Sequence, residues 1–139
     1  MPQISQAKPA KPPIDRSGRA RVGVASFYAD RFAGRKMADG VKMDPQGDNA
    51  ASRTLPLGTK AKVTNLVTGK SAVVVIEDRG PYAKGRIVDL SPSTARRIGI
   101  TRHIGVAKVV VAPISVPLAD GRIKPGIAAQ DDDNRVTQD

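Results

Sequence analysis

Residues 51–82, ASRTLPLGTKAKVTNLVTGKSAVVVIEDRGPY, hold two strand patterns joined by a turn, and this stretch decides the fold. In residues 60–66, KAKVTNL, the side chains alternate with the period of two that is typical of a half-buried strand. Thr68 and Gly69 then predict a hairpin turn. The β-branched run at residues 71–77, SAVVVIE, predicts a second strand, and we expect it to be buried on both faces.

The sequence on either side of this hairpin indicates short strands, long loops and one helix. Further strands are predicted at residues 22–28, 86–90 and 106–114. Residues 29–52 are rich in Gly and Asp and predict a long loop. Ser91 as N-cap, Pro92 in the first helical position and Gly99 past the end predict a helix over residues 92–98. This set of elements favours a small all-β barrel with little helix.

The composition is that of one small domain with an aliphatic core. The chain has 139 residues, of which 40% are hydrophobic but only 3% aromatic. It has no cysteine and one histidine, which excludes a disulfide scaffold, a cysteine zinc site, a thiol nucleophile and a multi-histidine metal site. No metal or nucleotide motif is present, so we expect no cofactor. No apolar run reaches the roughly 18–20 residues of a membrane span, and no signal peptide is visible.

The net charge of +10 belongs to the middle of the chain. Residues 19–115 contain 17 basic and 7 acidic residues, so this stretch alone carries the net charge of the whole chain. We predict a domain over residues 21–115, between a disordered tail or linker at 1–20 and a largely disordered extension at 116–139. The charge favours a polyanionic partner. We do not expect nucleic acid, because no aromatic platform or recognition helix is predicted.

Several long motifs occur in one order along the chain. They are GVASFYADRFAGRKMADG (23–40), the stretch 51–82 quoted above, GRIVDLSPSTARRIGI (85–100) and a closing valine strand. Over residues 22–114 the chain resembles the RlpA (rare lipoprotein A) family. The resemblance implies a six-stranded double-psi β-barrel with one short helix. Expansins and some cellulases share this barrel type, so the fold alone does not decide the function.

The resemblance also implies a substrate and a compartment. Active family members are lytic transglycosylases that cut peptidoglycan between N-acetylmuramic acid (MurNAc) and N-acetylglucosamine (GlcNAc) without water and leave a 1,6-anhydro sugar. Family members prefer strands stripped of stem peptides, so the resemblance implies a denuded, anionic glycan strand as the partner. We expect a monomer in the periplasm or cell envelope of a Gram-negative bacterium. A membrane contact is expected only through an N-terminal anchor that this sequence lacks.

Asp78, in the EDRGPY turn, matches the active-site aspartate of the family and is the candidate catalytic acid/base. An aspartate before Arg-Gly-Pro also caps turns well, so a structural role is the alternative. If Asp78 is catalytic, we expect it at the floor of an open groove with Ser52 nearby, and an Asp78 buried in bonds to turn amides would contradict the assignment. Glu77 should point to the opposite face of the strand.

Two positions depart from the pattern of active family members. Ser52 stands in AASRTLP where they carry histidine, and Val41 stands in MADGV where they carry glutamate. Neither side chain titrates near neutral pH. The serine can still hydrogen-bond a sugar, whereas the valine can only pack.

Other residues in the motifs are candidates for substrate binding. Tyr28 can stack on a sugar or pack in the core. The arginines Arg35, Arg53 and Arg79 can meet the lactyl carboxylates of muramic acid, although each is also an ordinary surface charge. We expect Asp89 to brace the barrel through a hydrogen bond. The sequence leaves two functions open, a lytic transglycosylase that uses Asp78 and a non-catalytic, expansin-like barrel that binds glycan.

Overall fold

The computed structural model describes residues 13–130, and the outer parts of both predicted tails lie outside them. The strands are β1 (Arg21–Phe27), β2 (Asn49–Ala51), β3 (Lys60–Asn65), β4 (Ser71–Asp78), β5 (Arg86–Leu90), β6 (Ala107–Pro117) and β7 (Ile123–Pro125). The helices are a single 3₁₀ turn, η1 (Asp30–Phe32), and a short α-helix, α2 (Pro92–Arg97). No helix within residues 13–130 is long and apolar enough to cross a membrane.

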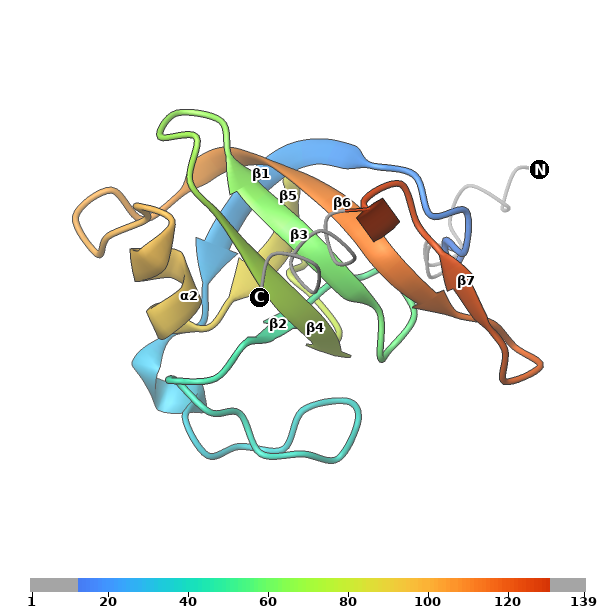
Figure 1. The fold of residues 1–139 in the computed structure, drawn as a ribbon. Coiled ribbons are helices and arrows are strands. Elements are labelled where there is room, and N and C mark those ends of the chain that lie inside the picture. Colours follow the sequence, from blue (N-terminus) through green and yellow to red (C-terminus); the bar gives the residue numbers. More distant parts are fainter. Residues whose placement is uncertain (1–12, 131–139) are drawn as a thin grey trace, which may run out of the picture.

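Six of the strands close into a barrel (Figure 1). The hydrogen-bonded order is β1-β5-β2-β4-β3-β6, and β6 also pairs with β1, which removes the open edge. Two neighbouring pairs, β1 with β5 and β2 with β4, run parallel, while the other pairs run antiparallel. The predicted all-β barrel with one short helix is therefore confirmed. The seventh strand, β7, lies outside the barrel and pairs with the end of β6.

The hairpin of β3 and β4 contains both predicted strands, but the burial of β4 differs from the prediction. In β3 the inward side chains, Ala61, Val63 and Asn65, are buried, as the alternation predicts. The prediction that the second strand is buried on both faces is wrong, because Val73 and Val75 are only half-buried. The barrel is a single layer here, and only one face of each strand reaches its interior. On the outer face these valines stand opposite lysines of β3.

The predicted loop at residues 29–52 contains a strand that the sequence did not indicate. This strand, β2, lies near the end of the predicted loop and pairs with both β4 and β5. The predicted helix is confirmed, although it ends at Arg97, one residue earlier than expected. The Ser91 hydroxyl accepts the Thr94 N–H at 3.2 Å, and Gly99 follows the helix with φ +91°. A left-handed conformation of this kind favours glycine.

Segments on both sides of the predicted domain pack on the barrel. The Gly18 carbonyl accepts the Ile127 N–H at 2.9 Å, and Gly126 lies so close to Pro113 that a Cβ would approach its carbonyl oxygen to 2.3 Å. The structure therefore differs from the predicted disorder over residues 13–20 and 116–130. Contacts between two distant segments create this order, and neither segment alone has a strong pattern.

The core is aliphatic, with Ile76, Leu90 and Ile98 among its largest fully buried side chains. Asn65 is the polar exception at the inward end of β3, where it is 2% exposed. Its amide nitrogen donates to the Ile98 carbonyl at 2.8 Å, and its amide oxygen accepts the Val67 N–H at 2.8 Å. One side chain thus joins the β3–β4 hairpin to the end of α2.

Asn65→Ala should lower the free energy of unfolding by about 2 kcal/mol, because the Val67 N–H loses its partner and the Ile98 carbonyl keeps only the Thr68 hydroxyl. Urea denaturation followed by circular dichroism measures this change. Val67→Ala is the matched control, since Val67 is 82% exposed and its loss should cost less than about 0.5 kcal/mol. Equal losses in the two variants would show that Asn65 does not link these elements.

Candidate functional site

The site forms where β4 ends beside β2. Ala51 is the register partner of Asp78, and the Ser52 N–H donates to the Asp78 carbonyl at 3.0 Å. Because β2 and β4 run parallel, the residues that follow both strands emerge at the same end of the barrel. The structure therefore brings Asp78 and Ser52 together, as the motifs predict.

Three donors converge on the Asp78 carboxylate. Its Oδ1 accepts the backbone N–H groups of Ala38 and Arg79, each at 2.9 Å, and its Oδ2 accepts the Tyr28 hydroxyl at 2.9 Å. The turn-capping role that the sequence offered as an alternative is thus present. The side chain is nevertheless partly exposed. Each carboxylate oxygen has about two acceptor positions, so Oδ1 is saturated and Oδ2 keeps one for another partner.

Tyr28 serves Asp78 and is not placed to stack on a sugar. The residue is 7% exposed, and its ring meets the Phe32 ring edge-on with centroids 6.2 Å apart. Burial, and then the hydrogen bond to Asp78, raises the pKa of Tyr28. The hydroxyl therefore stays protonated and keeps donating. This bond joins residues 50 positions apart, and no local pattern in the sequence indicates it.

Ser52 and Arg79 brace the turn next to Asp78. Ser52 is 3% exposed, and its hydroxyl oxygen accepts the N–H groups of Thr54 and Leu55 at 3.2 and 3.0 Å. The Arg79 guanidinium donates to the carbonyls of Ser52 and Leu55 at 2.9 and 2.6 Å. Both side chains thus hold the backbone of the site, and their contact with substrate stays a prediction.

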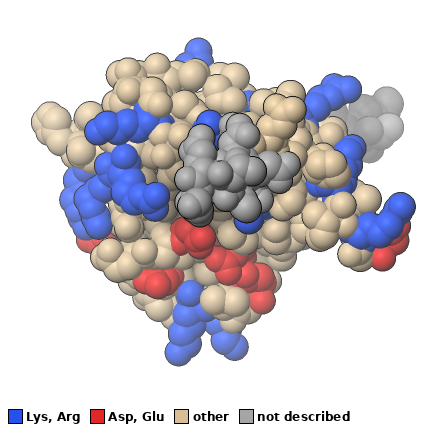
Figure 2. All heavy atoms as spheres, viewed as in Figure 1, with Lys and Arg blue, Asp and Glu red and all other residues tan. Residues whose placement is uncertain are grey.

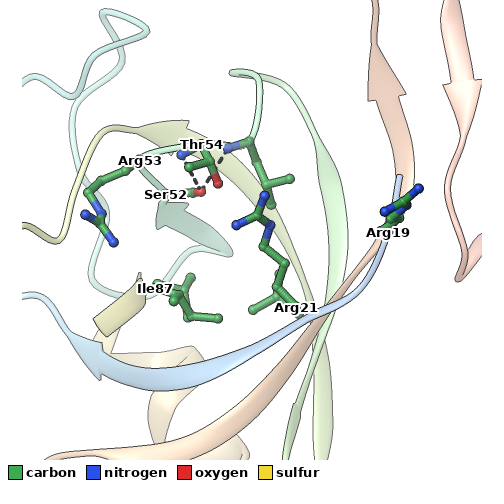
Figure 3. Close-up of a pocket in the computed structure, with 9 residues that line it drawn as sticks. Arg19, Arg21, Ser52, Arg53, Thr54 and Ile87 are labelled. Carbon is green, nitrogen blue, oxygen red and sulfur yellow. Dashed lines mark hydrogen bonds between the residues drawn. The ribbon is translucent and has the colours of Figure 1, made fainter. Parts of the chain in front are cut away.

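The remaining predicted residues lie in separate places. Arg53 lines a pocket with Ser52 and Arg21 (Figure 3). Arg35 is exposed, and its guanidinium carbon lies 5.8 Å from the centroid of the Phe32 ring. The expectation that Val41 packs is wrong, because it is 52% exposed in a surface loop.

Glu77 and Asp39 form a carboxyl pair that the sequence analysis did not assign to the site. Burial, and then a hydrogen bond with Asp39, raises the pKa of Glu77 to about 7, and the charge of Asp48 adds to the effect. The Asp39 N–H also donates to the Glu77 carbonyl at 3.0 Å. Figure 2 shows acidic side chains gathered near the end of β4, with Lys and Arg around them. The only sign of this pair in the sequence was the two adjacent carboxyl residues at positions 77 and 78. Nothing in the sequence indicated that the loop at residues 37–41 packs against them.

Asp89 braces the barrel, as the sequence predicts. It accepts a short hydrogen bond from the Ser26 hydroxyl, its register partner on β1. Burial raises the pKa of Asp89, and the Ser26 bond opposes this effect. Within residues 13–130, no group of three His, Cys, Asp or Glu side chains is arranged to hold a metal ion.

Comparison with known families decides the identity of this barrel. Residues 20–111 match the family model described as lytic transglycolase. The chain belongs to the RlpA family. It is 51% identical over 93 residues to a probable endolytic peptidoglycan transglycosylase RlpA of Synechocystis, covering 67% of this chain and 29% of that protein. It is 45% identical to the endolytic peptidoglycan transglycosylase RlpA of Pasteurella multocida, covering 81% of this chain and 38% of the relative.

The chain spans about a quarter to two fifths of the length of these relatives. Solved structures support its fold. The Streptomyces papain inhibitor aligns with a TM-score of 0.53 and 22% identity over 69% of this chain and 94% of the inhibitor. An expansin of Clavibacter michiganensis aligns with a TM-score of 0.52 and 19% identity over 72% of this chain and 52% of the expansin.

The Glu77 carboxyl should make the stability of the RlpA barrel depend on pH. Because folding raises its pKa from the ordinary 4.5 to about 7, the folded state binds its proton more tightly than the unfolded state. This stabilisation is complete below pH 4.5 and is lost as the pH rises through 7. Glu77→Gln should therefore shift the urea midpoint upward, relative to the unsubstituted protein, more at pH 8 than at pH 4.

Asp39→Asn provides an independent check of the same pair. Removing the Asp39 charge lowers the cost of ionising Glu77, so this variant should also gain relative stability at pH 8. Identical shifts at pH 4 and pH 8 for both variants would contradict the coupling of the two carboxyls.

Proposed function

We propose that this RlpA domain is an endolytic lytic transglycosylase that cleaves MurNAc–GlcNAc bonds in peptide-free glycan strands, with Asp78 as acid/base. The supporting observation is the Asp78 carboxylate itself. It is partly exposed at the end of β4, three donors hold it in place, and within residues 13–130 Oδ2 has one acceptor position that is not used. A carboxyl group that is held in place and remains partly exposed is suited to acid/base catalysis.

The reaction transfers one proton from Asp78 to the leaving oxygen and one proton from the substrate back to Asp78. Protonated Asp78 donates its proton to the glycosidic oxygen as the bond between that oxygen and the muramic C1 breaks. The 6-hydroxyl oxygen of the same muramic residue forms the new bond to C1, and its proton passes to the Asp78 carboxylate. The products are a free 4-hydroxyl and a 1,6-anhydro ring, and Asp78 is protonated again.

This chemistry tolerates the two departures from the family pattern. A hydrolytic glycosidase needs a pair of carboxyl groups, one for the leaving group and one for water or the sugar. In the proposed reaction the substrate supplies its own nucleophile, so one carboxyl suffices. Ser52 then contributes by bracing the turn beside Asp78, and Val41 contributes no acid/base group.

The second candidate function is a barrel that binds glycan without cutting it. Two observations favour it, namely that Ser52 and Val41 replace titratable groups and that Asp78 caps its own turn. With either function, we propose a monomer that binds an anionic peptidoglycan strand in the periplasm or cell envelope. Salt should weaken this binding, because the exposed basic side chains are screened.

Asp78→Asn should lower the rate of cleavage by at least about 100-fold, because the amide cannot exchange the proton that the reaction needs. The assay incubates peptide-free strands with protein and detects 1,6-anhydro-muramyl products by mass spectrometry. Co-sedimentation with the strands should be retained, since asparagine keeps the size of the side chain. If the unsubstituted protein forms no anhydro product, the binding function replaces the catalytic one.

Tyr28→Phe should lower kcat about tenfold with little change in KM, because the hydroxyl positions Asp78 and does not touch substrate. Steady-state kinetics on the same strands separates the two constants. A rise in KM at constant kcat would instead place the Tyr28 hydroxyl among the groups that bind substrate.

A further inference from the structure

The 37–41 loop supplies one of the three donors that hold the Asp78 carboxylate. Its Ala38 N–H donates to Asp78 Oδ1 at 2.9 Å. The next N–H along the loop, that of Asp39, donates to the Glu77 carbonyl at 3.0 Å. Two consecutive residues of the loop thus bind two consecutive residues at the end of β4, whereas the other donors to the carboxylate come from elsewhere in the chain.

Among the described residues, polar contacts are what hold the tip of this loop on β4. At its base, Met37 is 5% exposed and packs in a small cluster with Tyr28 and Met43. At the tip, residues 38–41 are all exposed and bury little apolar surface. A segment with few buried apolar contacts opens locally at a small cost in free energy. The docking of the tip therefore depends on its hydrogen bonds with the end of β4.

The side chains of Asp39 and Glu77 add a further contact, a hydrogen bond between two carboxyl groups. An ionised carboxylate can only accept hydrogen bonds, so this bond exists only while one of the two groups carries a proton. When both groups are ionised, repulsion between like charges replaces the bond. Burial, and then the hydrogen bond with Asp39, raises the pKa of Glu77 to about 7, so this change occurs near neutral pH.

Charged groups on the surrounding segments face the same pair. Asp48, which precedes β2, adds to the rise in the pKa of Glu77. Three lysines also lie on these segments, namely Lys36 and Lys42 at the base of the loop and Lys60 on β3. The pKa of Glu77 is raised in their presence, so burial and the neighbouring carboxyl groups outweigh the positive charges.

We propose that the Asp39–Glu77 pair positions the Asp78 carboxylate for the reaction. While the two carboxyls share one proton, the tip of the loop stays on β4 and its Ala38 N–H stays on Asp78 Oδ1. Once both are ionised, the tip moves away from β4 and Asp78 loses this donor. Neither Asp39 nor Glu77 needs to touch substrate, since both act through Asp78.

The effect of pH follows from the ionisation of the pair. Below pH 7 Glu77 keeps its proton and the loop stays docked, and as the pH rises through 7 the loop is released. Asp78 keeps its other two donors, so it stays in the site but is held less firmly. The role in catalysis rests on the proposed function, whereas the contact between loop and strand is a property of the free protein.

Hydrogen exchange of the Ala38 amide tests this contact in the full chain. NMR gives its protection factor, which is the exchange rate of an unprotected amide divided by the measured rate at the same pH. We expect this factor to fall at least about tenfold between pH 5.5 and pH 8.5, as the loss of a charge-assisted hydrogen bond predicts.

Glu77→Gln should abolish this fall, because a glutamine amide donates to the Asp39 carboxylate at every pH. The protection factor of Ala38 should then differ by less than about twofold between the two pH values. Asp44→Asn is the matched control, since Asp44 is an exposed aspartate that accepts the Gln46 N–H and does not act on Glu77. It removes one carboxylate from the same part of the surface and should keep the tenfold fall.

The same two variants connect the contact to catalysis. The kcat of Glu77→Gln, divided by that of the unsubstituted protein, should rise about fivefold from pH 5.5 to pH 8.5, because the variant keeps its loop docked. The corresponding ratio for Asp44→Asn should stay constant. A constant ratio for Glu77→Gln would overturn the positioning role.

The exchange measurement can overturn the inference without any substrate. An Ala38 amide that is unprotected at pH 5.5, or equally protected at both pH values, would do so, as would a fall that persists in Glu77→Gln. A failure of the proposed function is recognised separately, because it appears as missing anhydro products while the exchange result stands.

Discussion

Closure of the sheet through β6 is the constraint on which the rest of this structure depends. This strand pairs with β3 along one part and with β1 along another, so six short strands form one barrel with no open edge. Closure forces the parallel pairs β1–β5 and β2–β4 to lie within the same wall. The parallel pair β2–β4 then brings Ser52 beside Asp78, so the candidate site is a consequence of barrel topology.

Local signals in the sequence account for most of the barrel. Period-two alternation located β3, and a capping serine, a proline and a following glycine located α2. The three residues of β2 carry no such pattern, because their strand conformation comes from pairing with β4 and β5. The burial of Val73 and Val75 was misjudged for a related reason. A β-branched run indicates a strand but not which neighbours cover its outer face.

Motifs likewise located the candidate site more accurately than its contacts. They placed Asp78 and Ser52 together, but they left Tyr28 between stacking on a sugar and packing in the core, and they suggested that Ser52 can hydrogen-bond a sugar. In the fold both side chains are buried and serve the backbone or the carboxylate. Such contacts join residues far apart in the chain or depend on the exact path of a turn. Neither property is encoded in spacing, which is also why the Glu77–Asp39 pair was missed.

The local distribution of charge on the barrel is more informative than its net charge. A uniformly basic surface would attract any polyanion, whereas here acidic side chains gather near the end of β4 and the basic pocket opens beside the 52–55 turn (Figure 2, Figure 3). Opposite charges thus lie on different parts of the same surface, and Glu77 adds its charge to the acidic part only as the pH rises through about 7. Net charge favours association with a polyanion in general, whereas the separation of acidic and basic side chains limits the orientations in which an anionic polymer meets complementary charge.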